Sequence, residues 1–144
     1  MSNITKVIES TNDEANYVRK KLIEFNSKHV SNGIYEEINL CLKDDEGEVI
    51  AGLNSAICWN WMEIDILWVD GDRRGQGLGK KLLEEAEQIA REKSCTFIKL
   101  NTFSFQAPEF YKKYGYEVIT IIENAPLGCK HYYYKKDLNY IIRD

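Results

Sequence analysis

The sequence lacks the features that mark membrane, secreted and nucleic-acid-binding proteins. No stretch approaches the roughly 18 consecutive apolar residues that a membrane span requires, and residues 1–10 lack the basic segment and apolar run of a signal peptide. The formal net charge is -4, so the chain offers no net basic surface to nucleic acid or to an anionic membrane. We therefore expect a cytoplasmic protein with neither partner, and an amine or cationic substrate suits its charge better.

Metal-binding and disulfide patterns are also missing. The chain has four cysteines and two histidines, and no two cysteines form a C-x-x-C pair. Such scattered residues are poor material for a zinc site or a disulfide framework, and free cysteine is usually a buried packing residue. The sequence therefore predicts no metal.

The chain has enough apolar material for one core, since 44% of its 144 residues are hydrophobic, and it shows no repeat or linker. We expect a single domain over residues 1–144. The hydrophobic periodicity and the turn residues predict, in order, a strand at 3–8, a helix from a Thr11–Glu14 capping box to about His29, strands at 37–43, 48–58 and 62–69, a helix from about Leu78, a strand at 96–102, a short helix at 106–114, and strands at 116–122 and 130–136. This order predicts an α/β (α+β) fold with a mixed, mostly antiparallel central sheet of about 6–7 strands flanked by about 3–4 helices.

A glycine-rich loop, Arg74 to Lys80, lies between a predicted strand and a predicted helix. Three glycines let the main chain approach an anion, the helix N-terminus adds partial positive charge, and Arg74 and Lys80 add full charges. The alternative is a glycine-rich turn that only starts a helix. A P-loop needs glycine where Arg74 stands, and a dinucleotide-binding fingerprint needs a small residue at Lys80, so neither motif fits.

The loop resembles the R-x-x-G-x-G signature of the GNAT superfamily of N-acetyltransferases, as Arg74, Gly77 and Gly79. Residues 66–69 resemble the family's fourth strand and residues 110–116 its F-Y-x-x-x-G-F/Y element. The resemblance implies acetyl-coenzyme A as co-substrate, with the pyrophosphate on the loop and the pantetheine arm along the strand, where that strand splays from the next. The cofactor-binding residues it implies are Leu67, Trp68, Val69, Arg74, Gly75, Gln76, Gly77, Leu78, Gly79, Lys80 and Gln106, the last in place of a frequent asparagine.

Acetyl transfer to an amine requires a base, because an alkylammonium is almost fully protonated at neutral pH. Glu63 and Asp65 are predicted to alternate with Leu67 and Val69 along one strand face. The resemblance assigns Glu63 as general base, acting through water, and leaves Asp65 as an alternative base or a partner of a cationic acceptor. It also assigns Tyr111 as the acid. The simpler interpretation is that both carboxylates are solvated and that Tyr111 packs in the core.

The acceptor is a small-molecule or peptide amine that the sequence does not identify. Tyr35, Trp61 and Asp65 are the predicted substrate-binding residues, and the two aromatics are alternatively core anchors or a dimer contact. His131 could reach the acceptor or be structural. The sequence thus predicts an N-acetyltransferase acting by direct attack in a ternary complex. The alternatives are a non-catalytic acyl-coenzyme A-binding module and, less favoured, a nucleotide-binding protein, and the run Tyr132–Tyr134 could pair two copies as a homodimer.

Overall fold

The computed structural model describes residues 3–4, 6–30 and 33–138. The chain divides into two compact units, Met1–Gly33 and Ile34–Asp144, which are considered separately. The expectation of a single domain over the whole chain stays a prediction. No helix in the described ranges is long and apolar enough to cross a membrane.

The first unit contains the helix α1, Asn12–Ser27. The predicted capping box is present: the Glu14 amide donates to Thr11 Oγ1 at 3.2 Å, and the Thr11 amide donates to Glu14 Oε1 at 2.8 Å. The predicted strand at 3–8 is wrong, because residues 3–4 and 6–8 are not in a strand. A strand needs a hydrogen-bonded neighbour, and the described part of this unit contains none.

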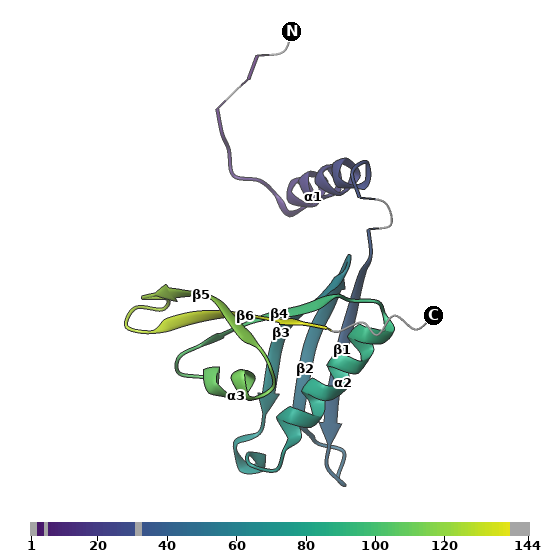
Figure 1. The fold of residues 1–144 in the computed structure, drawn as a ribbon. Helices are drawn as coiled ribbons and strands as arrows, with labels where there is room; N and C mark the ends of the chain where they lie inside the picture. The colour runs from purple at the N-terminus through teal and green to yellow at the C-terminus, as the bar shows by residue number, and fades with distance from the viewer. Residues whose placement is uncertain (1–2, 5, 31–32, 139–144) are drawn as a thin grey trace. The chain divides into compact units, whose positions relative to one another are not determined.

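The second unit is built on a six-stranded sheet with the strand order β1-β2-β3-β4-β6-β5 (Figure 1). The strands are β1 Tyr35–Lys43, β2 Val49–Cys58, β3 Trp61–Val69, β4 Phe97–Phe103, β5 Glu117–Glu123 and β6 Lys130–Asp137. All neighbours pair antiparallel except β3 and β4, which are parallel. The 3-10 turn η1 (Gly71–Arg73) and the helices α2 (Leu78–Glu92) and α3 (Pro108–Lys113) complete the unit. The predicted mixed, mostly antiparallel fold is confirmed.

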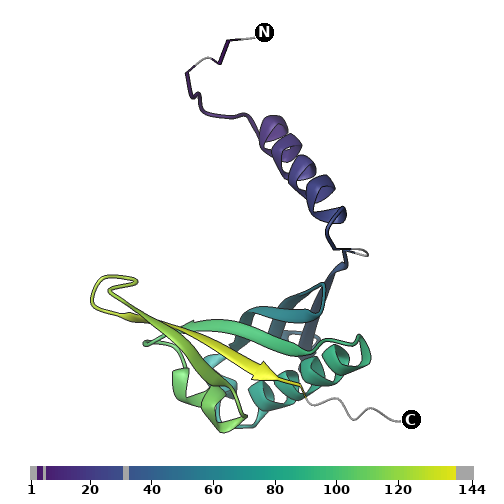
Figure 2. The same cartoon turned by 45° about the horizontal axis from the view of Figure 1, so that its top comes forward.

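The helix α2 covers one face of β1, β2 and β3 (Figures 1 and 2). Its apolar residues recur at helical spacing, so Leu82, Ala86 and Ala90 form one buried stripe. They pack against Leu53 of β2 and the other buried residues of the sheet in one hydrophobic cluster. This packing fixes the position of the loop that begins α2, because the helix cannot shift without opening the core.

The strand β3 has two halves with different neighbours. It pairs with β2 along its whole length, but its pairing with β4 runs only from Trp61↔Phe97 to Ile64↔Leu100. A bulge also falls at Asp65, since Ile64 pairs with Ser55 and Ile66 with Asn54. From Asp65 onward, β3 and β4 part.

The bulge corrects the predicted strand face. Met62 and Ile64 are buried in the core, and Leu67 and Val69 also pack against it. Glu63, between Met62 and Ile64, therefore points away from the face that carries Leu67 and Val69. The prediction that Glu63 shares a face with these residues was wrong, because the extra residue at Asp65 reverses the alternation.

Candidate active site

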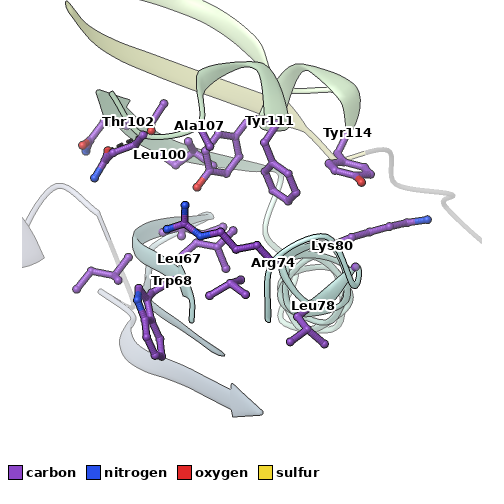
Figure 3. Close-up of a pocket in the computed structure, with 18 of the residues that line it drawn as sticks. Leu67, Trp68, Arg74, Leu78, Lys80, Leu100, Thr102, Ala107, Tyr111 and Tyr114 are labelled. Atoms are coloured by element: carbon purple, nitrogen blue, oxygen red, sulfur yellow. Dashed lines mark hydrogen bonds between the residues drawn. The ribbon is translucent and has the colours of Figure 1, made fainter. Parts of the chain in front are cut away.

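A cleft of about 640 Å³ opens where β3 and β4 part. The start of α2 closes one end, and α3 with the loop before it covers the other side (Figure 3). In Figure 3 the Arg74 side chain extends between the helix that carries Tyr111 and the strand that carries Leu67 and Trp68. The predicted site residues that line the cleft are Asp65, Leu67, Trp68, Val69, Arg74, Gly75, Gly77, Leu78, Gly79, Lys80, Gln106 and Tyr111.

The glycine loop presents open backbone to the cleft. Gly75 and Gly77 have φ of +81° and +76°, a left-handed conformation that favours glycine. A Cβ at either position would meet no atom within 4 Å, so the space beside the loop is free. Gly77 is also the N-cap of α2, and no side chain caps the helix and no acidic residue lies in its first turn. Unpaired N–H groups and the helix dipole therefore favour an anion at this end of the cleft.

Two neighbouring arginines of the loop have different surroundings. Both line the cleft, but Arg73 pairs with Asp44, with Nη2 and Oδ2 at 3.6 Å. Arg74 lines the cleft and has no ion-pair partner within the described part of the chain. Lys80 also lines the cleft, and its Nζ lies 3.7 Å from Glu84 Oε1. Arg74 is therefore the cation most available to a bound anion.

The third glycine of the loop serves packing. A Cβ at Gly79 would lie 3.3 Å from Phe110 Cζ and 3.7 Å from Val69 Cγ2. Glycine here lets α2 approach α3 and β3 closely. Gln76 is the one predicted loop residue that does not line the cleft.

The second half of β3 leaves its backbone free on the cleft side. Leu67, Trp68 and Val69 line the cleft, while β4 pairs only as far as Ile64. Main-chain N–H and C=O groups of this edge are available to an extended ligand, as at any unpaired strand edge.

Gln106 lines the cleft from the opposite wall, at the turn that follows β4. Its Oε1 accepts hydrogen bonds from the Phe103 amide at 2.9 Å and from Thr102 Oγ1 at 3.2 Å. The side-chain carbonyl is therefore used in closing the turn. Only its amide N–H groups remain to contact a ligand.

The two candidate carboxylates are separated by the bulge. Asp65 is exposed and lines the cleft. Glu63 does not line it; the β3–β4 register places Glu63 opposite Lys99, and Lys99 Nζ lies 3.5 Å from Glu63 Oε1. Asp65 is thus the nearer carboxylate to the cleft, and Glu63 is held beside a cation on the outer face of the sheet.

Tyr111 lines the cleft but is only 7% exposed. Burial raises its pKa to about 12, with a smaller contribution from the nearby Tyr134. The helix that carries it is fixed, since Tyr134 Oη donates to the Pro108 carbonyl at 2.8 Å. The hydroxyl of Tyr111 therefore keeps its proton at neutral pH and can donate a hydrogen bond into the cleft.

Tyr35 and Trp61, two predicted acceptor residues, lie away from the cleft lining. Tyr35 starts β1 and pairs with Cys58, which in turn pairs with Trp61. The Trp61 ring stacks on Phe97, with centroids 5.7 Å apart and an interplanar angle of 14°. The structure brings these two residues to the other end of β3.

Sequence reasoning missed much of the wall formed by the end of β4 and by α3. The missed lining residues include Leu100, Asn101, Thr102, Phe105, Ala107, Phe110 and Tyr114. Of these, only Phe110 and Tyr114 carried a sequence signal, because they lie within the F-Y-x-x-x-G element. Among the described residues, no group of three or more histidine, cysteine, aspartate or glutamate side chains is placed to hold a metal ion.

The comparisons with known proteins find acetyltransferases by sequence family, by sequence identity and by structure. The family model of the acetyltransferase (GNAT) family matches residues 8–116. The chain is 39% identical over 95 residues to a blasticidin-S acetyltransferase of Streptomyces morookaense, a match that covers 65% of this chain and 70% of that protein.

Two solved structures extend the comparison. A crystal structure of an acetyltransferase from Bacillus cereus has 37% sequence identity to this chain and a TM-score of 0.88. The match covers 93% of this chain and 98% of the Bacillus cereus chain. An aminoglycoside 6'-N-acetyltransferase complexed with coenzyme A shares the fold at 16% identity, with a TM-score of 0.66 and coverage of 90% and 91%.

Proposed function

The chain belongs to the acetyltransferase (GNAT) family and is an acyltransferase, and from this premise we propose that it transfers an acetyl group from acetyl-coenzyme A to a primary amine by direct attack in a ternary complex. The observation that supports the co-substrate is the open glycine loop at the uncapped start of α2, beside Arg74, which has no ion-pair partner among the residues that the structure describes. A pyrophosphate matches these donors in charge and in size. The coenzyme A in a structural neighbour supports the same ligand.

The residues present fit acetyl-coenzyme A along the whole cleft. Amides of Gly75 to Lys80 with the Arg74 guanidinium would hold the pyrophosphate, and the free edge of β3 at Leu67 to Val69 would hold the amide-bearing pantetheine arm. Acetyl-coenzyme A supplies a thioester that an amine can attack without a metal or a covalent enzyme intermediate. The strand amides that face the cleft are fixed donors for negative charge on an oxygen.

Asp65 and Glu63 have different proposed roles: Asp65 binds the acceptor ammonium and Glu63 accepts its proton. Asp65 lines the cleft, which favours direct contact with the acceptor ammonium. Glu63 lies beyond the bulge and accepts the proton through a bound water.

Tyr111 is the proposed hydrogen-bond donor to the departing sulfur. Its hydroxyl lies in the cleft wall, and burial keeps it protonated with a pKa of about 12. Because a thiol has an ordinary pKa of about 8.5, a thiolate does not take the proton outright from this hydroxyl, which instead stabilises negative charge on the sulfur by donating a hydrogen bond to it. Phenylalanine at this position would keep the packing and remove the proton.

The acceptor is proposed to be a small cationic amine. The relative named for blasticidin-S supports a small molecule, and Asp65 in the cleft supports a cation. A shorter match, 42% identical over 65 residues, is to a peptidyl-lysine N-acetyltransferase of Salmonella typhimurium and makes a lysine side chain the second class to test.

Thiol release from acetyl-coenzyme A, measured with blasticidin S and with a lysine-containing peptide, tests this function. Tyr111→Phe, Glu63→Gln and Asp65→Asn are each expected to lower kcat/KM at least tenfold while coenzyme A affinity, measured by calorimetry, stays within about threefold of wild type. A rise in KM alone for Asp65→Asn identifies an ammonium contact, and a fall in kcat for Glu63→Gln identifies the base. Full activity of both carboxylate variants would overturn the assigned roles.

A further inference from the structure

A row of stacked rings begins at the cleft and runs across the end of β4 onto β6. Phe105 stacks on Phe103 with centroids 5.4 Å apart and planes 7° apart. Phe103 stacks on His131 at 4.2 Å and 18°, and His131 contacts Tyr133 at 4.5 Å. The first ring, Phe105, lines the cleft and is 62% exposed.

Packing alone does not account for Phe105. The residue lies beyond the end of β4, so it has no cross-strand partner that would hold it on the sheet. An exposed aromatic ring in water loses the apolar burial that normally stabilises it. One of its faces rests on Phe103 while the ring borders the cleft, which leaves aromatic surface for a ligand to stack on.

Asn101, another residue of the cleft lining, has an amide group held by a hydrogen bond. Asn101 follows Leu100, the last residue of β4 that pairs with β3, and it lines the cleft. Its Oδ1 lies 2.9 Å from His131 Nε2. With Nε2 protonated, the imidazole donates to the amide oxygen and leaves the two amide N–H donors of Asn101 to the cleft.

His131 is itself held in place. It pairs with Phe103 in the β4–β6 register and lies between the rings of Phe103 and Tyr133. An imidazole held on both sides cannot rotate freely, so its hydrogen bond fixes the orientation of the Asn101 amide. Asp65 lines the same cleft from β3 and adds a negative charge.

We propose that Asn101 and Phe105 form a subsite for a planar, hydrogen-bonding group of the acceptor, and that His131 is the positioning residue that holds the Asn101 amide. The acceptor is then a small amine with two parts. Its cationic part lies at Asp65, and its flat ring stacks on Phe105 and hydrogen-bonds to Asn101 through a polar edge. This inference rests on the proposed function, since it names the class of acceptor for the same site.

The test measures binding of three primary amines to the coenzyme A complex by calorimetry. All carry the amine on the same two-carbon chain, attached to a 2-aminopyridine, a phenyl or a cyclohexyl ring. We expect the phenyl amine to bind about threefold more tightly than the cyclohexyl amine because it stacks, and the aminopyridine about threefold more tightly again because of its polar edge. Equal dissociation constants for the three would overturn the subsite.

Variants show which residue causes each of the two expected differences in amine affinity. Phe105→Leu is expected to remove the advantage of phenyl over cyclohexyl, and Phe105→Tyr to retain it. Asn101→Ala is expected to remove the advantage of aminopyridine over phenyl. If Phe105→Leu weakens coenzyme A binding and leaves the amine order unchanged, the ring belongs to the cofactor and the proposal fails.

A matched pair of substitutions separates positioning from packing at His131. His131→Gln keeps an N–H donor for Asn101 but loses the ring, whereas His131→Phe keeps the ring but loses the donor. Positioning predicts that His131→Gln retains the preference for aminopyridine over phenyl and that His131→Phe loses it. The opposite result would assign His131 to packing. A ratio of two dissociation constants within one variant is independent of how much of that variant is folded.

These measurements need no turnover, so they distinguish two kinds of failure. If no amine is acetylated but the three amines bind in the expected order, the catalytic proposal fails and the subsite stands. If amines are acetylated with no preference for a ring, the catalytic proposal stands and the subsite fails.

Discussion

The two halves of β3 show how one strand serves stability and ligand binding in turn. From Trp61 to Ile64 the strand has a hydrogen-bonded neighbour on both sides, and Met62 and Ile64 are 0% and 2% exposed. From Asp65 to Val69 only β2 remains beside it, and Ile66 and Trp68 are 53% and 46% exposed. The boundary is the bulge at Asp65, where β4 departs.

The difference shows that the cleft forms where β3 no longer has β4 as a hydrogen-bonded neighbour. In the first half, side-chain burial and two ladders stabilise the sheet. In the second half, the main-chain amides on the cleft side have no strand to pair with, and the apolar side chains are half-exposed. An extended ligand that carries amide groups can hydrogen-bond to these main-chain amides and cover these side chains. Substitutions on the two sides of the boundary are therefore expected to affect different quantities.

The largest expected effect tests the stability of the first half. Met62→Ala removes a fully buried side chain and should lower the free energy of unfolding by about 2 to 5 kcal/mol, because it leaves a cavity in the core. Ile66→Ala, its match in the second half, should cost about 1 kcal/mol or less. Urea denaturation measures both, and similar losses would remove the distinction between the halves.

The next effect concerns Tyr111, which is both a core residue and a cleft residue. Its pKa is raised from an ordinary value of about 10 to about 12, so the folded state holds the proton more tightly than the unfolded state does. This contribution to stability is complete below pH 10 and is lost as the pH rises through about 12. Between neutral pH and about pH 11.5, the wild type should lose about 2 kcal/mol more stability than Tyr111→Phe does.

Urea denaturation at several alkaline pH values checks this difference. The pKa of Tyr116 is also raised, chiefly by burial, and because Tyr111 contributes a smaller part of that shift, the effect of Tyr116 cancels only in part. Parallel pH profiles for wild type and Tyr111→Phe would show that the Tyr111 hydroxyl is better solvated than the structure indicates.

The smallest effect compares the two adjacent arginines of the loop. Arg74→Ala removes the cleft-lining arginine that has no ion-pair partner among the described residues, and it should raise the dissociation constant of coenzyme A about tenfold. Arg73→Ala removes a partly exposed ion pair with Asp44 and should change it less than about threefold. Calorimetric titration of both variants decides the matter, and equal losses would mean that the loop acts only through its net charge.

Much of this arrangement could be predicted from the sequence. The elements from β1 to β6 follow from periodicity and turn residues, and twelve of the predicted site residues line the cleft. The match is physical: a glycine loop before an amphipathic helix must expose N–H groups wherever the helix lies. The cytoplasmic location and the homodimer stay predictions.

The rest depended on where strands stop pairing, which local sequence does not reveal. The bulge at Asp65 reverses the strand alternation, so Glu63 and Leu67 face opposite sides although their spacing suggests one face. Asn101 and Phe105 reach the cleft only because β4 leaves β3 after Leu100. The sequence favours Tyr35, after the first predicted helix, and Trp61, at the turn before β3, as acceptor-side aromatics, but the cleft opens at the other end of β3.

Amide hydrogen exchange with and without acetyl-coenzyme A tests the central claim most directly. The parted half of β3 and the start of α2 bind the ligand, so exchange should slow at residues 65–69 and 75–80. Residues 61–64, already paired on both sides, should change little. Protection that appears equally in both halves, or in neither, would contradict the assignment of the cleft as the acetyl-coenzyme A site.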